Sequence, residues 1–175
     1  MSKNYFPNPG NQCFSSSLAN LLVELGDRNM AEVVFMKCRN NPFWSPDLGV
    51  PSAIVTRMVS DLTCQKYEGT IFIEIYSCIS DQELTRLIRS TYGEKTDEIL
   101  GIYYEEREKG RIKTYNGITD FNIPAIVMVS TKNHQQNHFM VYAGGTAYID
   151  NGKRIRGPSI KDVDFPGVLE VRLND

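Results

Sequence analysis

Residues 8–22, NPGNQCFSSSLANLL, place a cysteine between a loop of turn residues and an apolar helical stripe. Cys13 stands in the expected first turn of that helix, where backbone N–H groups lack partners within the helix. A core cysteine is more usually found within the apolar stripe. Because the N-terminus of a helix stabilises a thiolate, Cys13 is a candidate nucleophile.

Hydrophobic periodicity predicts three helices before the first strand. The first helix covers residues 13–25, and its apolar face consists of Phe14, Leu18, Leu21, Leu22 and Leu25. Asp27 is expected to cap a second helix that extends to about Cys38 and turns Met30, Val33 and Val34 inward. The third helix begins near Pro51, and its inward positions are Ile54, Val55, Met58, Val59 and Leu62.

In the middle of the chain, the sequence pattern predicts a strand, then a helix, then a charged segment. Residues 69–77, GTIFIEIYS, alternate isoleucine with other side chains, which indicates a strand at a sheet edge. Ser80 and Glu83 have the capping-box spacing and open a helix that ends at Gly93. Residues 94–117 are charged and poorly periodic, and we interpret them as a short helix or solvated arm.

The last third of the chain predicts strands at residues 123–130, 137–144, 146–150 and 167–173. Gly144-Gly145 is the expected hairpin turn between the second and third of these. Helices followed by strands indicate an α+β fold in which N-terminal helices pack on a C-terminal antiparallel β-sheet. We therefore expect a single domain over residues 1–175, with the charged insertion at about 94–117.

Composition limits the class of protein. With 41% hydrophobic and 10% aromatic residues the chain has enough apolar material for a core. A formal net charge of -2 without a Lys/Arg block argues against a nucleic-acid binder. No apolar run is long enough for a signal peptide or a membrane span, so we expect a cytoplasmic protein. The remaining cysteines, Cys38, Cys64 and Cys78, are expected to be buried free thiols.

A cysteine nucleophile needs a base and a group that orients that base. His138 begins one predicted strand and Asp150 ends the next, so antiparallel pairing brings the two together. Asn151 is an alternative orienting group. His134 precedes His138 by four residues, but no carboxylate or cysteine cluster accompanies the pair, and we expect no metal site.

This order of cysteine, histidine and aspartate resembles the papain-like cysteine peptidase superfamily. Within it, the chain is most similar to the bacteriocin (double-glycine) leader peptidases attached to ABC transporters and to their stand-alone relatives. The matching features are Pro124-Ala125-Ile126, His138-Phe139 with Val141 and Gly144, Ile149-Asp150, and residues 164–173, DFPGVLEVRL. The resemblance implies a papain-like fold with a triad of Cys13, His138 and Asp150.

The chain departs from the family pattern beside the cysteine. The family has a glutamine six residues before the cysteine that helps to form the oxyanion hole, and Pro7 occupies that position here. Gln12 is then the preferred oxyanion donor, followed by Asn8, with the backbone N–H of Cys13 as a second donor. Phe14 replaces the family's glycine after the cysteine and is expected to narrow the substrate cleft.

These residues predict a cysteine peptidase-like thiol hydrolase that cleaves a peptide or isopeptide bond in a peptide or protein substrate. No metal or organic cofactor is needed for this chemistry. A transglutaminase-like acyltransferase, in which an amine replaces water, is one alternative. A non-catalytic peptide-binding module on the same fold is the other, and Pro7 in place of the family glutamine favours it.

Overall fold

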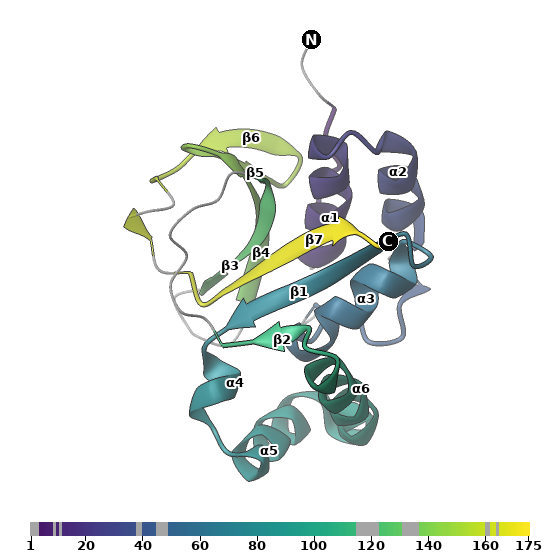
Figure 1. Cartoon of the computed structure of the whole chain (residues 1–175), viewed down its shortest axis with the longest axis vertical. Coiled ribbons are helices and arrows are strands. Elements are labelled where there is room, and N and C mark those ends of the chain that lie inside the picture. The colour runs from purple at the N-terminus through teal and green to yellow at the C-terminus, as the bar shows by residue number, and fades with distance from the viewer. Residues whose placement is uncertain are drawn as a thin grey trace.

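The computed structural model describes residues 4–8, 10, 12–37, 40–44, 49–114, 123–130, 137–159, 162–163 and 165–175. The helices are α1 (Cys13–Glu24), α2 (Arg28–Lys37), α3 (Val55–Leu62), α4 (Ile75–Cys78), α5 (Asp81–Tyr92) and α6 (Thr96–Glu108), with short 3-10 turns η2 (Ser52–Ile54) and η3 (Gly93–Lys95). The strands are β1 (Tyr67–Ile73), β2 (Ile112–Lys113), β3 (Ala125–Ser130), β4 (Asn137–Gly144), β5 (Ala147–Asp150), β6 (Lys153–Arg156) and β7 (Gly167–Leu173). Together they form an α+β fold, as the sequence predicts (Figure 1).

The strands form one seven-stranded sheet in the order β2-β1-β7-β3-β4-β5-β6. Neighbouring strands are antiparallel except β1 and β2, which are parallel, so the sheet is mixed and not wholly antiparallel. Strand β7 lies between β1 and β3, where Leu169 is in register with both Ile71 and Ile126. The last strand of the chain therefore joins the two parts of the sheet.

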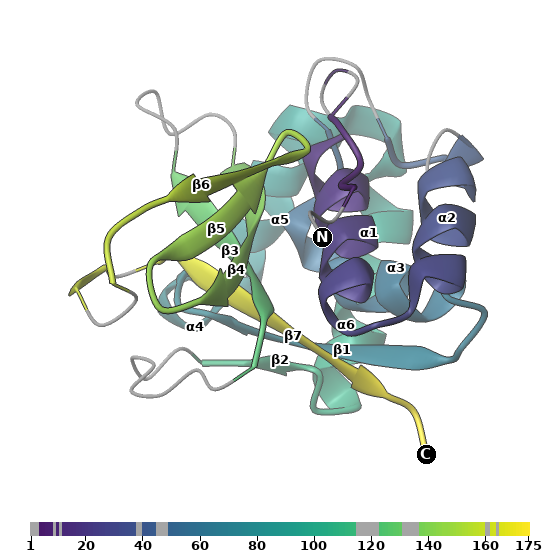
Figure 2. The same ribbon diagram turned by 90° about the horizontal axis from the view of Figure 1, so that it is seen from above.

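Helix α1 lies in the bend of the sheet, with β4, β5 and β6 on one side and α2 on the other (Figures 1 and 2). All of its residues from Phe14 to Val23 are buried, including the polar residues Ser17 and Asn20 on the face opposite the predicted apolar face. The N-terminal segment covers that face. The Phe6 N–H donates to Asn20 Oδ1 at 2.7 Å, while Asn20 Nδ2 and Ser16 Oγ both donate to the Phe6 carbonyl at 3.0 Å.

A second apolar cluster includes Tyr142, Tyr148 and Phe165. Tyr142 and Tyr148 are direct cross-strand partners with ring centroids 5.6 Å apart. The Tyr148 hydroxyl donates to the Pro158 carbonyl at 2.8 Å, and so ties strand β5 to the segment that follows β6. The β4–β5 hairpin therefore takes part in both apolar clusters, since Val141 and Ile149 belong to the cluster around α1.

Several local expectations are confirmed. Ser80 Oγ accepts the N–H of Glu83 at 3.2 Å and caps α5, which ends at Gly93. Asp27 Oδ1 accepts the N–H of Met30 at 3.2 Å at the start of α2. All five inward positions predicted for the third helix are buried. Cys38, the predicted end of the second helix, lies outside the described residues.

The strand predicted over residues 69–77 is wrong at its C-terminal end. Strand β1 ends at Ile73, and the chain turns into the short helix α4, where Ile75 is 50% exposed. Strand β1 is also not an edge strand, because β2 and β7 flank it. Alternation of isoleucines continues past the true end of the strand, so the pattern alone misplaces that end.

The interpretation of residues 94–117 as a solvated arm is also wrong for the part that the structure describes. Helix α6 buries Ile99, Tyr103 and Glu106 and packs against α5, η2 and α3. Several of its charged residues form ion pairs with residues outside the helix, among them Arg57 of α3 and Asp81 of α5. Of the two predicted alternatives, a short helix and a solvated arm, the described residues contain a helix, α6, and it contributes to the core.

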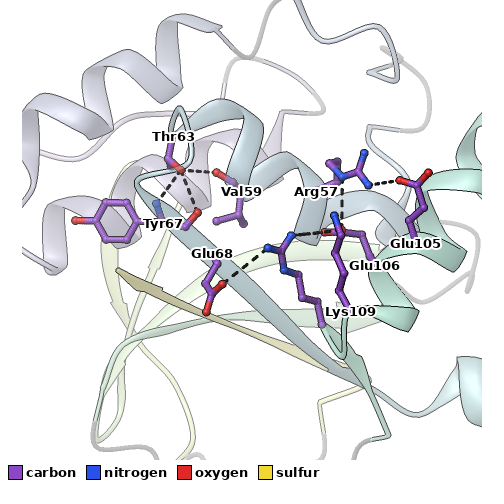
Figure 3. A network of polar contacts seen from close by, with 9 residues as sticks. Arg57, Val59, Thr63, Tyr67, Glu68, Glu105, Glu106 and Lys109 are labelled. Carbon is purple, nitrogen blue, oxygen red and sulfur yellow. Dashed lines mark hydrogen bonds and ion pairs between the residues drawn. The ribbon is translucent and has the colours of Figure 1, made fainter. Parts of the chain in front are cut away.

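A buried carboxylate anchors α6. Glu106 is 0% exposed, with Arg57 Nε of α3 at 3.5 Å and Lys109 Nζ at 3.7 Å (Figure 3). Arg111, just before β2, brings Nη1 to 3.2 Å from the same carboxylate and also lies 3.8 Å from Glu68 of β1. Because three cations surround it, the Glu106 charge is compensated and links α6 to α3 and to the sheet.

We expect Glu106→Ala to lower the free energy of unfolding by about 3 kcal/mol, because it leaves partly buried cations without their partner. Urea denaturation measures the change. Glu105→Ala is the matched control, since Glu105 is the neighbouring residue on α6 and pairs with Arg57 at the surface. Its loss should be much smaller. Equal losses in the two variants would contradict the anchoring role of Glu106.

Candidate active site

Cys13 is the first residue of α1 and is partly exposed. The carbonyl of Gln12 accepts the N–H of Ser16 at 2.9 Å, which closes the first helical turn. The first turn contains no acidic residue. The positive end of the helix dipole therefore acts on the thiol without an adjacent carboxylate to offset it.

His138 and Asp150 lie together at the end of the β4–β5 hairpin. His138 Nε2 is 2.8 Å from Asp150 Oδ1, and the two side chains are 33% and 32% exposed. By the register of Val141 with Ile149, Asp150 is a diagonal neighbour of His138 across the ladder. The hairpin thus brings together the histidine and the aspartate selected from the sequence.

The thiol of Cys13 is the third member of this group. A hydrogen bond with Cys13 is the largest cause that raises the pKa of His138 from 6.5 to about 9. Burial of the ring lowers the pKa, while the hydrogen bond and the charge of Asp150 raise it further. Because Nε2 is directed at Asp150, Nδ1 is the ring nitrogen left for the thiol. The imidazole therefore lies between thiol and carboxylate.

Contacts one turn along α1 fix the helix against β4. Ser17 Oγ donates to the carbonyl of Phe139 at 3.0 Å, and both residues are buried. The rings of Phe14 and Phe139 pack edge to face with centroids 5.4 Å apart. Phe14 and Phe139 are the sequence neighbours of Cys13 and His138, so these contacts set the distance between thiol and imidazole.

Sequence reasoning did not select Ser17 or Phe139 for the site. The available signal is that Ser17 is four residues after Cys13 and so lies on the same face of the helix. Phe14 is only 1% exposed, so the expectation that it narrows a substrate cleft is wrong. It belongs to the core beneath the site.

The loop before Cys13 is held by two asparagines. Asn8 Oδ1 accepts the N–H of Gln12 at 2.9 Å, and Asn151 Oδ1 accepts the N–H of Asn8 at 2.9 Å. The oxygen of Asn151 is thus directed at the loop, while Asp150 holds the position next to His138. Gln12, the preferred oxyanion donor, is 7% exposed and adjoins the thiol in the sequence.

The other described residues considered as metal ligands or reactive thiols are not part of the group formed by Cys13, His138 and Asp150. In the described ranges, no three His, Cys, Asp or Glu side chains form a group that could hold a metal ion. His134 lies outside those ranges. Cys64 and Cys78 are exposed, so the expectation that they are buried is wrong. A search of the described helices finds none with the length and apolar character to cross a membrane.

Comparisons with known proteins find no matching family model, no similar curated protein and no similar solved structure. The chemistry of the site therefore has to be argued from its own residues.

The raised pKa of His138 predicts a specific NMR titration. Wild-type His138 should lose its proton at about pH 9, and Cys13→Ala should lower that pKa because the thiol hydrogen bond is the largest single cause. Asp150→Asn should also lower it, because the carboxylate contributes both a hydrogen bond and a charge. The carbon-bound ring protons report the titration, and the chain has only two histidines, so His138→Gln assigns the signal. A wild-type pKa near 6.5 would contradict the contact between His138 and Cys13.

Proposed function

We propose that the protein is a papain-like thiol hydrolase that cleaves a peptide or isopeptide bond. The observation that carries the proposal is the imidazole of His138, which lies 2.8 Å from Asp150 Oδ1 and whose pKa is raised by its interaction with Cys13. A nucleophile, a base and an orienting carboxylate in contact are the elements of covalent acyl transfer. The position of Cys13 at the start of α1 adds an electropositive environment for the developing charge.

The first half of the reaction forms a thioester. The sulfur of Cys13 attacks the carbonyl carbon of the substrate, and its proton is held by His138. The carbonyl electron pair moves to oxygen, and that oxyanion accepts hydrogen bonds from the N–H of Cys13 and from the Gln12 amide. When the C–N bond breaks, protonated His138 gives its proton to the leaving amine.

The second half of the reaction releases the acyl group. Neutral His138 takes a proton from water, and the hydroxide attacks the thioester carbon. The C–S bond then breaks, the carboxylic acid departs, and the proton on His138 again faces the sulfur. Asp150 keeps the ring in one orientation and stabilises the imidazolium, without itself accepting the proton.

The order of elements supports a papain-like assignment within the α+β fold. Cysteine opens the first helix, histidine lies on β4 and aspartate ends β5, with α1 packed against β4. A cytoplasmic location is part of the same proposal, since a nucleophilic thiol has to stay reduced. The expected substrate is a peptide or protein, and no cofactor enters any step.

The pH dependence of Cys13 alkylation tests the proposal. Iodoacetamide should modify wild-type Cys13 much faster than the exposed Cys78 at pH 6, where His138 still carries its proton. His138→Ala should abolish this low-pH reactivity, because the positive charge beside the sulfur is lost. Peptide mass locates the label, and exposed Cys78 is an internal reference in the same digest.

If Cys13 follows Cys78 at every pH in both proteins, the proposed hydrolase is wrong. Where Cys13 is activated, a mixture of peptides incubated with a labelled primary amine identifies the acceptor. Cleaved peptides without label support hydrolysis. Peptides that carry the amine on a new amide bond would instead identify an acyltransferase.

A further inference from the structure

The turn that follows Asp150 packs against the loop that precedes Cys13. Asn151 and Gly152 form the two-residue turn between β5 and β6, with φ of 51° and 77°, values typical of a type I′ hairpin. A Cβ atom at Gly152 would lie 3.1 Å from the Cα of Pro7. Glycine therefore serves two needs here, the positive φ and the close approach of two backbones.

Hydrogen bonds continue this contact to the site. Asn151 Oδ1 accepts the N–H of Asn8, and Asn8 Oδ1 accepts the N–H of Gln12, each at 2.9 Å. The carbonyl of Gln12 in turn accepts the N–H of Ser16 at 2.9 Å. Both backbone groups of Gln12 are thus held, and the direction of the Cys13 N–H, in the same peptide unit as the Gln12 carbonyl, is fixed with them.

The same loop is attached to α1 on its other side. The backbone N–H and carbonyl of Phe6 are both bonded to the side chain of Asn20. Nearby, Tyr5 donates to Glu24 of α1, and Arg154 of β6 lies 3.8 Å from the same carboxylate. The described part of the loop is therefore clamped between the helix and the hairpin.

We propose that Asn151 and Asn8 are positioning residues that align the oxyanion donors of the Cys13 site. This inference rests on the proposed function. One hairpin then sets both halves of the site: Asp150 orients the imidazole, and the next residue, Asn151, orients the backbone that leads to the Cys13 N–H. Asn8 acts in this arrangement through its carbonyl oxygen on Gln12, as a support and not as a direct donor to substrate.

A structural role alone predicts a different result from a positioning role. Asn151 is exposed, and so is its hydrogen bond to Asn8, so losing this bond should leave the midpoint of thermal unfolding nearly unchanged. Misplaced oxyanion donors, in contrast, weaken only those reactions in which a carbonyl carbon becomes tetrahedral and its oxygen gains negative charge. Two thiol probes separate these effects, since only one of them produces such an oxygen.

Iodoacetamide and the peptide aldehyde acetyl-Ala-Ala-alaninal are suitable probes for Cys13. With iodoacetamide the sulfur displaces iodide, and no oxyanion forms. With the aldehyde the sulfur adds to the carbonyl carbon, the π electron pair moves to oxygen, and that oxygen takes a proton to give a reversible hemithioacetal. The aldehyde affinity is measured as protection of Cys13 from alkylation, so one mass readout serves both probes.

Asn151→Gly is the informative variant, because glycine accepts the positive φ of the turn but has no oxygen for Asn8. We expect Asn151→Gly and Asn8→Ala to weaken aldehyde binding about tenfold and to change the alkylation rate less than about twofold. Asn151→Asp, which keeps an acceptor oxygen and tolerates the same φ, should restore aldehyde binding. Thermal unfolding of each variant checks the fold.

Two results would overturn the positioning role. One is aldehyde binding in Asn151→Gly and Asn8→Ala equal to that of the wild type. The other is a parallel loss with both probes, which would show that the asparagines hold the thiol site together as a whole. Failure of the proposed function is distinguishable from both, because wild-type Cys13 would then lack rapid alkylation at pH 6 before any asparagine is changed.

Discussion

The buried polar face of α1 is the constraint on which the arrangement of the molecule depends. Ser16, Ser17 and Asn20 lie within the protein, where an unpaired polar group costs more than its hydrogen bond contributes. Their partners are backbone groups of two segments distant in sequence, Phe6 before the helix and Phe139 on β4. The hydrogen bonds that these buried side chains require therefore place the N-terminal loop on one side of Cys13 and the strand of His138 on the other.

The chemistry of the site follows from this placement and from two tight turns. The hairpin turn lies at Gly145-Thr146, one residue later than the predicted Gly144-Gly145, and it folds β5 back on β4 and brings Asp150 to His138. The Asn151-Gly152 turn then carries the chain against the loop at Pro7. Rigid secondary structure thus supports every proposed reacting group, and the base acquires its raised pKa from two neighbours supplied by different elements.

Local signals in the sequence predicted those features that depend on few residues. The cap of α5 at Ser80, the β4–β5 hairpin and the apolar face of α3 involve neighbours only a few positions apart. The sequence also predicted a cysteine at a helix start and a histidine and an aspartate across one hairpin, because these features too depend on short stretches of chain. The outcome for His138 and Asp150 shows that a correct register places two side chains well even before the fold is known.

Features that depend on partners distant in the sequence could not be predicted from the sequence alone. Residues of α6 look solvated until Arg57 and Arg111 surround Glu106, and the Lys-Arg-Ile-Arg sequence of β6 shows no alternation because all four residues are exposed. The bond between Asn8 and Asn151 spans 143 positions, and no periodicity encodes such a pair. The supports of the site are thus harder to find than its reacting groups.

The central place of β7 has a consequence for the kinetics of folding. Strands β1 and β3 do not touch each other, because β7 lies between them and pairs with both. Until β7 enters, the sheet consists of two separate parts, and closing it requires contacts across about a hundred residues, which is slow for entropic reasons. Insertion of β7 is therefore the natural rate-limiting step of folding. Before that step the sheet is incomplete, and so is the surface against which helix α1 packs.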